Sequence, residues 1–570
     1  MKTFGALAGR RLPAHLTARL ASWGAQPGAL VWQPAPPVTG DLAIARRLAN
    51  GILLFEGRLV ETRERLPWEL EAPDQVWQDE LHGHGWLDHA AAAQDSAIWD
   101  HLAAWVWDWI ARFGTGDGPG WEPELVARRL TRWIAHSVRL LNAQNAERSE
   151  LFFQSLGMQA RYLDWRWRET RDGAERIEAL CGLVYAQLSL EGSGKAAQRA
   201  IVDLGREARR IVGADGTIAS RSPEELARIL ALLVWARGSI EDAGLKPAKD
   251  HEQVIRQAIP VVRALRHPSG DLARFHGGRP GIGLPLEALT AADTAMPLPE
   301  GPVMGYRHMT QGESLVIADT APPPGQGYRG SAHASALAFE FSHSGQPVVV
   351  NCGPGAGFGV KAAITSRRGP AHSTVELGGR CPARVVAGKG RHNTAILTAE
   401  GAVSARTSLD ASGAWIMAAS TLYESWFGLT VERRLHLRKD GLKLSGEDTA
   451  LATRAETRAQ IAAAFPDPGA PCPLITRFHL HPEVKASLAL NGRAVALRLP
   501  DGSQWMMTSD ADELRLEPSR YFDETRPKPR ATSQIVAASH VMEYWGRVTW
   551  SLERLPHGTS PLKARTESGF

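Results

Sequence analysis

The spacing of apolar residues changes near the middle of the chain. Between residues 97 and 265 they recur at three- and four-residue steps, which predicts a series of amphipathic helices. In segment 122–142, Val126, Leu130, Trp133 and Leu141 share one helical face. Similar patterns predict helices over 151–168, 175–190, 196–212, 223–237 and 251–265. Helices that repeat every twenty-odd residues with short connections indicate an α/α toroid, here an incomplete one.

From about residue 300 the apolar period falls to two, which is typical of β-strands. The pattern predicts strands over 314–319, 336–342, 347–353, 373–379, 394–399, 414–420, 429–438, 441–448, 486–492, 495–500 and 548–554. So many short strands separated by turn residues indicate a large antiparallel β-sandwich. A segment rich in Gly and Pro, 275–302, joins the two halves. We therefore predict a helical domain over 1–290 and a sandwich domain over 291–570.

Composition narrows the class of protein. A chain of 570 residues exceeds the usual limit for one hydrophobic core, which agrees with two domains. A net charge of +4 without a dense basic stripe argues against nucleic acid as a partner. The four cysteines are far apart, so we expect neither a disulfide framework nor a thiolate zinc site. We expect no signal peptide at the N-terminus and no membrane-spanning segment.

Tryptophan is unevenly distributed, with fourteen of nineteen residues before position 290. Helix packing explains most of them, and stacking of a sugar ring in a groove is the alternative. Adjacent odd positions on a helix diverge by about 200°. Trp105, Trp107 and Trp109 therefore cannot all lie in the core.

The richest candidate chemistry lies in SAHASALAFEF, residues 331–341. If the strand starts that early, Ser331, His333 and Ser335 share a face with Phe339. The next predicted strand closes on Asn351, and another begins beside His372. Two imidazoles and an amide oxygen at converging strand ends would be usable zinc ligands, while a hydrogen-bonded structural pair of histidines is the alternative.

These segments resemble the heparinase II/III family of polysaccharide lyases. The family motif resembles H-A-H-A-D-A-L-S-F-E-L, then a strand ending in Val-Asn/Asp-Pro/Cys-Gly, then R-S/T-x-A-H-N/S-T. This chain has SAHASALAFEF, VNCG (350–353) and RGPAHST (368–374) in that order. RFHLHP (477–482), a further strand segment, and LRHPSGDLARFHGG (265–278) also resemble family segments. The resemblance implies an α/α toroid followed by a β-sandwich.

The resemblance further implies β-elimination on a polysaccharide that contains uronic acid. A base removes the C5 proton, the neighbouring carboxylate is neutralised, and an acid serves the C4 leaving oxygen. In the family the first His of the motif is catalytic, and a second His, an acidic residue and a third His hold zinc. The corresponding positions here are Ser331 for the catalytic His, and His333, Asn351 and His372 for the metal ligands. The family motif has an Asp two residues after its second His, and Ser335 occupies that position in this chain.

The toroid residues of the family are replaced as well. Its G-N-H-L-like helix start aligns with 173–176 and its S-P-x-Y-H-like start with 222–226, which lack the Asn, Tyr and His. Glu175 and Glu225 are alternative bases, although a glutamate at a helix start also complements the helix dipole. Tyr306 and Tyr328 are candidate proton donors, or they pack at an interface.

A substrate carboxylate would need a cationic partner. Arg329, Arg367 and Arg368 are the candidates, and surface or interdomain salt bridges are their alternative role. The resemblance leads us to predict a lyase with rebuilt acid and base groups. The alternatives are a protein that binds an acidic glycan without cleaving it and a structural descendant of the family. The resemblance implies zinc as a cofactor and the cell envelope or periplasm as the location, whereas the N-terminus favours the cytoplasm.

Overall fold

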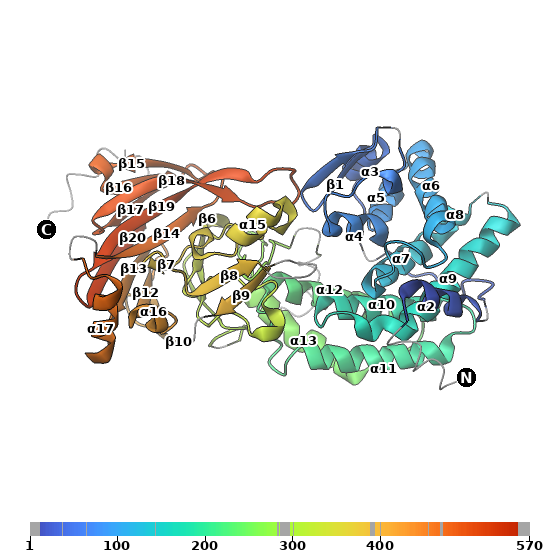
Figure 1. Ribbon diagram of the computed structural model, residues 1–570, viewed down its shortest axis with the longest axis horizontal. Coiled ribbons are helices and arrows are strands. Elements are labelled where there is room, and N and C mark those ends of the chain that lie inside the picture. The colour runs from blue at the N-terminus through green and yellow to red at the C-terminus, as the bar shows by residue number, and fades with distance from the viewer. Residues whose placement is uncertain are drawn as a thin grey trace. The chain divides into compact units, whose positions relative to one another are not determined.

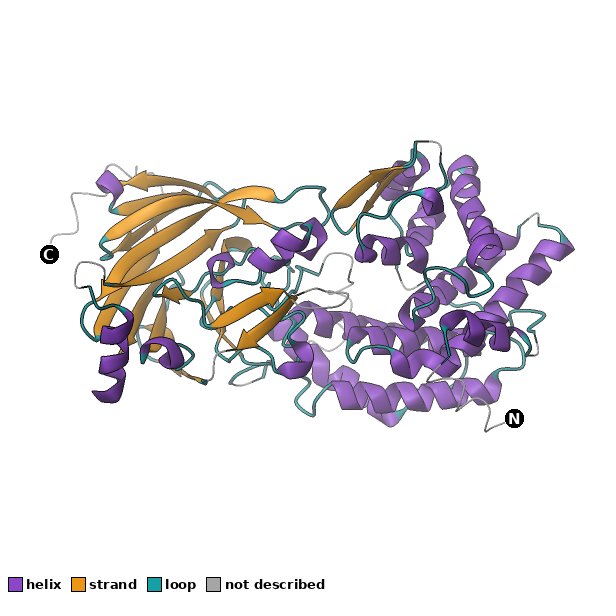
Figure 2. Ribbon diagram, viewed as in Figure 1, coloured by secondary structure: helices purple, strands orange, loops and turns teal. Residues whose placement is uncertain are grey.

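A computed structural model describes residues 12–556, apart from 25, 37, 64, 143, 282–283, 285–296, 300, 388–393, 399–400, 454 and 468–470. The chain divides into two compact units. The helical unit comprises 1–216, 225–259 and 283–292, and the sandwich unit comprises 217–224, 260–282 and 293–570. Helices dominate the first half of the chain and strands the second (Figure 2). Two short segments before residue 290, 217–224 and 260–282, thus belong with the sandwich.

The helical unit is a series of helices with one small hairpin of strands, β1 and β2. The helices are α2 (Ala14–Ser22), α3 (Leu42–Ala49), α4 (Gln75–Gly83), α5 (Trp86–Ala92), α6 (Ser96–Phe113), α7 (Pro123–Ala135), α8 (Ser137–Leu141), α9 (Ala146–Arg166), α10 (Ala174–Ser189), α11 (Gly194–Ile211), α12 (Pro223–Asp242) and α13 (Lys249–Ala264). The hairpin pairs β1 (Ile52–Phe55) with β2 (Arg58–Glu61). The long helix α10 packs against both α7 and α11 (Figure 1).

The predicted helices after residue 120 are confirmed, with one break. Segment 122–142 forms two helices, because α7 ends at Ala135, His136 forms a turn, and α8 begins at Ser137. Helix starts follow the capping rules: Asp41, Asp74, Asp95 and Asn145 accept hydrogen bonds from backbone amides of the first turns of α3, α4, α6 and α9. These side chains satisfy amides that a helix leaves unpaired.

Three tryptophans of the helical unit, Trp109, Trp121 and Trp133, lie around a buried arginine. Arg129 is fully buried, and its guanidinium carbon lies 3.8 Å from the ring centre of Trp109. It also donates to the carbonyls of His82 and Gly120. Trp105 and Trp109 are buried whereas Trp107 is partly exposed, so the prediction that these three cannot all be core is confirmed.

The sandwich unit contains two large antiparallel sheets. One follows the order β10-β11-β12-β13-β20-β17-β16-β15, and the other β18-β19-β14-β6-β5-β4-β3, with β7 also paired to β14. The strands are β3 (Tyr306–Gln311), β4 (Ser314–Asp319), β5 (Phe339–His343), β6 (Gln346–Val350), β7 (Val375–Leu377), β10 (Val403–Leu409), β11 (Gly413–Ser420), β12 (Thr430–Arg438), β13 (Lys443–Leu451), β14 (Cys472–Leu480), β15 (Lys485–Ala489), β16 (Ala494–Arg498), β17 (Gln504–Ser509), β18 (Glu513–Tyr521), β19 (Arg530–Val541) and β20 (Trp545–Arg554). A separate pair joins β8 (Ala383–Ala387) to β9 (Thr394–Thr398).

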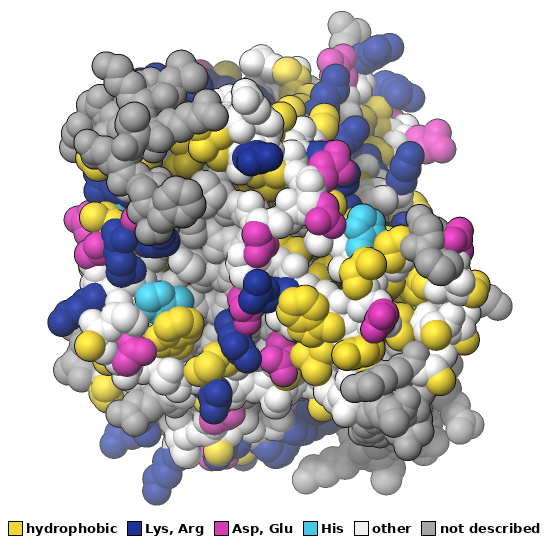
Figure 3. All heavy atoms as spheres, turned by 90° about the vertical axis from the view of Figure 1, so that its left-hand side faces the viewer, with side chains coloured by type: hydrophobic (Ala, Val, Ile, Leu, Met, Phe, Trp, Pro, Cys, Tyr) yellow, Lys and Arg dark blue, Asp and Glu magenta, His cyan; other side chains and the backbone are white. Residues whose placement is uncertain are grey.

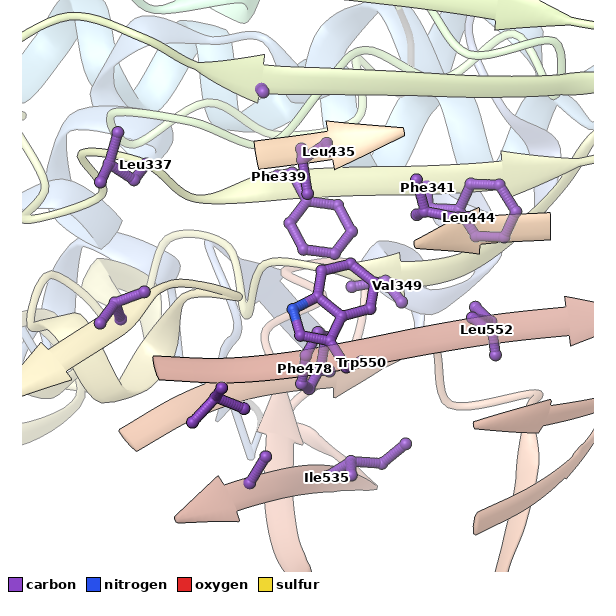
Figure 4. Close-up of a cluster of buried hydrophobic side chains, with 14 of the residues drawn as sticks. Leu337, Phe339, Phe341, Val349, Leu435, Leu444, Phe478, Ile535, Trp550 and Leu552 are labelled. Carbon is purple, nitrogen blue, oxygen red and sulfur yellow. The ribbon is translucent and has the colours of Figure 1, made fainter. Parts of the chain in front are cut away.

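Aromatic and aliphatic side chains from both sheets form the core of the sandwich (Figure 4). Phe339 of β5 stacks on Trp550 of β20 with ring centres 5.6 Å apart, and Phe478 of β14 meets the same indole edge-on at 4.7 Å. These contacts join the two sheets. The predicted fold class, a helical toroid-like half followed by an antiparallel sandwich, is therefore confirmed.

All eleven strand segments predicted from the apolar period contain a strand, but the one at 336–342 starts later than expected. Residues 331–338 are not extended, because Ala338 N–H bonds back to Ser335 O and Leu337 has a φ of +65°. The interpretation that Ser331, His333 and Ser335 continue the face of Phe339 is therefore wrong. The apolar period also missed β3, β8, β10, β17, β18 and β19.

Candidate functional site

Two histidines and an asparagine meet at the edge of the sandwich. His333 Nδ1 lies 3.2 Å from His372 Nε2, and His372 Nδ1 lies 3.3 Å from Asn351 Oδ1. All three side chains are buried. The structure thus brings the predicted trio together, although His333 comes from an irregular turn, His372 from the end of the short helix at 369–371 and Asn351 from the end of β6.

A buried glutamate fixes the orientation of the Asn351 amide. Glu340 Oε1 accepts from Asn351 Nδ2 at 3.1 Å and from Asn351 N at 3.0 Å. On the opposite side, Asn351 Oδ1 accepts from Ser373 N at 3.1 Å. A carboxylate can only accept and a backbone N–H can only donate, so the positions of the amide nitrogen and oxygen follow from their partners. Glu340 Oε2 in turn lies 3.1 Å from His267 Nε2.

A second chain of polar groups adjoins the first through His276. Its Nδ1 accepts from His333 N at 3.1 Å, and its Nε2 lies 3.4 Å from Asp319 Oδ2. Asp319 is fully buried at the end of β4, forms an ion pair with Arg221, and accepts from Ser335 Oγ at 2.8 Å. Arg221 donates to several sandwich carbonyls as well, among them that of Met304. Ser335 therefore belongs to this network as a hydrogen-bond donor to Asp319.

Four of the eleven non-glycine residues with positive φ in the described part of the protein lie around this second chain of polar groups. Arg221, His276, Met304 and Leu337 all have φ between +47° and +65°, a region that non-glycine residues rarely adopt. Leu337 N donates to the carbonyl of Asp319, so each strained residue contacts Asp319 or one of its partners. Such strain persists only where surrounding contacts over-determine it, and it is concentrated at functional sites.

Burial keeps the histidines of the site neutral. Burial, with smaller effects of neighbouring histidines, lowers the pKa of His372 to about 3 and holds the pKa of His333 well below its ordinary value. The pKa of His276 is also lowered, mainly by burial. Burial opposes ionisation of Asp319, but Arg221 and His276 outweigh it and hold the pKa of that carboxyl below its ordinary value.

The geometry does not suit the expected zinc site. His333 and Asn351 contact opposite nitrogens of the His372 ring, so the three donors do not converge on one point. A structural zinc ion normally takes four protein ligands and a catalytic one three. Within the described part of the chain, no group of three or more His, Cys, Asp or Glu side chains could hold a metal ion.

The predicted proton-transfer groups of the sandwich have other partners. The Ser331 hydroxyl donates to the carbonyl of Tyr328 at 3.4 Å. Tyr306 is buried, its hydroxyl donates to the carbonyl of Arg221 at 2.6 Å, and burial raises its pKa well above the ordinary value. Tyr306 therefore acts as a packing residue, which was the alternative role considered for it. Tyr328 is half-buried in a short 3-10 helix.

Glu175 and Glu225 approach each other at the start of α10. A Cβ built on Gly173 would collide with Glu225 Oε1 and would lie 3.7 Å from Glu175 Oε2. Glu175 forms an ion pair with Arg171, and Glu225 accepts from Ala174 N at 3.3 Å. Glu225 of α12 thus binds the first turn of the neighbouring helix α10, whereas Glu175 lies in the first turn of its own helix, where a carboxylate complements the positive helix end.

Of the three arginines expected to bind a substrate carboxylate, only Arg368 is exposed. Arg367 is buried and donates to the carbonyls of Ala332 and Arg329, so it braces the turn that carries His333. Arg329 is half-buried. Acidic and basic side chains are interspersed on the face of the molecule in Figure 3, in line with the small net charge.

Sequence reasoning did not single out four members of the site: Arg221, His276, Asp319 and Glu340. For two of them, Asp319 and Glu340, the sequence contains a signal. Asp319 ends the apolar strand SLVIAD and Glu340 lies within ALAFEF, so both charges fall inside segments whose other members are buried. A buried charge requires a partner. Which partner it finds depends on residues distant in the sequence.

Residues 293–551 match the family model described as "Heparinase II/III-like, C-terminal". The chain therefore contains a heparinase II/III-like C-terminal domain. It is also 29% identical over 544 residues to "FtsZ-localized protein C" from Caulobacter vibrioides (strain NA1000 / CB15N), an alignment that covers 93% of this chain and 91% of that protein.

Solved structures agree on the fold. "Crystal Structure of Heparinase III" superposes with a TM-score of 0.65 at 14% identity and covers 91% of this chain and 86% of that chain. The heparan sulfate lyase HepC mutant from Pedobacter heparinus gives a TM-score of 0.56 at 15% identity, over 96% of this chain and 88% of that chain. Among the described helices, none combines the length and apolar character needed to cross a bilayer.

The buried neutral histidines predict a loss of stability in mild acid. His479 is a suitable reporter, since burial lowers its pKa to about 4 while the unfolded chain titrates near 6.5. The contribution of neutral His479 to the free energy of unfolding is present above pH 6.5. It is lost as the pH falls toward 4, because the unfolded chain takes up a proton on this histidine before the folded chain does. Each such histidine should cost about 2 kcal/mol between pH 7.5 and pH 5. Urea titrations at both pH values measure this, and H479Q should show a smaller pH dependence than the unaltered chain.

Proposed function

We propose that this chain is a non-catalytic member of the heparinase II/III family that acts as a binding protein. The observation that carries the proposal is Ser331, which stands at the position of the family's catalytic histidine. Its hydroxyl bonds to a backbone carbonyl, with no imidazole or carboxylate among its described partners. A serine without an adjacent base is a poor acceptor of a carbon-bound proton.

The other requirements of β-elimination are also unsupported by the described contacts. The reaction needs a base for the C5 proton, a cation for the uronate carboxylate and an acid for the leaving oxygen. Tyr306 is buried and engaged, and Arg367 is occupied by backbone carbonyls. Lyase activity with a rebuilt acid and base is the alternative that an assay must exclude.

The assay measures absorbance of the unsaturated uronate product on heparin, heparan sulfate, chondroitin, hyaluronan, alginate and bacterial acidic exopolysaccharides. We expect no product above a blank, with or without added zinc. Turnover by the unaltered chain that disappears in H333A would overturn the proposal. An active heparinase III run in parallel serves as the positive control.

We further infer that the partner of this chain is the FtsZ polymer or a protein bound to it. The support is the relative named FtsZ-localized protein C, which aligns over nearly the full length of both chains. Co-sedimentation of the purified chain with FtsZ should be greater with GTP, when FtsZ polymerises, than with GDP. Equal amounts in the two pellets would contradict direct binding to polymer.

A further inference from the structure

Asn351 uses donor and acceptor groups at the same time. Its Nδ2 and backbone N–H both donate to Glu340 Oε1, while its Oδ1 accepts from Ser373 N. An aspartate here could not donate from its side chain. It would place a second carboxylate about 3 Å from Glu340, where one of the two would have to take up a proton.

The Asn351 amide sets the protonation of both histidines. Since Asn351 Oδ1 can only accept, His372 must carry its proton on Nδ1. His372 Nε2 is then a bare acceptor, so His333 Nδ1 must donate to it. His333 Nε2 is left unprotonated, and no described residue forms a hydrogen bond with it. The hydrogen bonds thus all run in one direction: His333 donates to His372, and His372 donates to Asn351.

We propose that Asn351, His372 and His333 form a metal-independent hydrogen-bond chain in place of the zinc site that the family resemblance implies. Glu340 is the acceptor that makes an asparagine the fitting residue at position 351. The donors do not converge on one point, and the proton on His333 Nδ1 fills the space between the facing nitrogens of His333 and His372, so that no ion can bridge them. This inference is independent of the proposed FtsZ partner.

The test compares N351D with the double variant N351D/E340Q in untagged protein. We expect less than about 0.1 zinc per unaltered chain by mass spectrometry, and no change in Tm with zinc or EDTA. N351D should lower Tm by about 5–10 °C, since it removes the donor to Glu340. Adding E340Q should restore part of that loss, because a glutamine amide can donate to the carboxylate that N351D introduces, although its nitrogen cannot accept from the backbone N–H of residue 351.

A zinc site predicts the opposite changes in Tm. Asp is a better zinc ligand than Asn, so N351D would gain Tm in zinc, and E340Q would not rescue it. About one zinc per unaltered chain, or a fall in its Tm with EDTA, would overturn the proposal. If N351D fails to fold, the metal content and the EDTA response of the unaltered chain still decide between the two accounts.

Discussion

Replacing Arg433 by leucine should cost about 3–5 kcal/mol of unfolding free energy, because it leaves a charge buried without its partner. Arg433 of β12 pairs with Asp448 of β13 through two hydrogen bonds, of 2.6 and 3.0 Å, and Asp448 is fully buried. Arg433 Nη1 also donates to the carbonyls of Leu337 and Ser373, beside the candidate site. Urea titration followed by circular dichroism measures the loss.

The neighbouring residue Arg434 provides a matched control. Its side chain is 54% exposed and makes only surface ion pairs with Glu432 and Glu447, so R434L should cost less than about 1 kcal/mol. The double variant R433L/D448L should recover part of the loss, since it removes the orphaned carboxylate as well. An R433L protein within about 1 kcal/mol of the unaltered chain would contradict the expectation.

Asp319→Ala should be nearly as damaging, at about 3–5 kcal/mol, because Asp319 is the carboxylate partner of Arg221. The substitution also removes the acceptor of Ser335 and the carboxylate beside His276. The strained backbone at Arg221 and His276 would then lose contacts that hold it. Urea titration at pH 7 measures the effect.

Ser335→Ala is the control for Asp319→Ala. It removes one hydrogen bond and leaves the ion pair of Asp319 with Arg221 intact, so it should cost about 1 kcal/mol. Equal losses in the two variants would show that the ion pair contributes little.

The local pattern of apolar residues was sufficient to predict most helices and strands. Helices from α9 to α13 follow from apolar residues at three- and four-residue steps, and the ends of most fall close to the prediction. The break at His136 was missed because the apolar period continues across it. Strand β18 was missed because it lies at a sheet edge and mixes exposed charges with few buried apolar residues.

The alternation of β12 contained a signal that was not used. In TVERRLHLR, Arg433 has the parity of Val431, Leu435 and Leu437, which all face the core. A charge at an inward position predicts a buried partner. Asp448 has the matching inward position on β13, directly opposite Arg433 in the register.

The sequence by itself determined the two-part architecture and the motif in which Ser331 aligns with the histidine that the resemblance makes catalytic, because period, order and residue identity are local properties. Only the tertiary structure decided what the remaining polar residues do. Asn351, His372 and His333 were candidate zinc ligands, with a hydrogen-bonded pair of histidines as the alternative, and their described contacts link them by successive hydrogen bonds. Hydrogen bonds depend on the positions of individual atoms, and these are set by contacts with Glu340 and His276, which come from other segments of the fold.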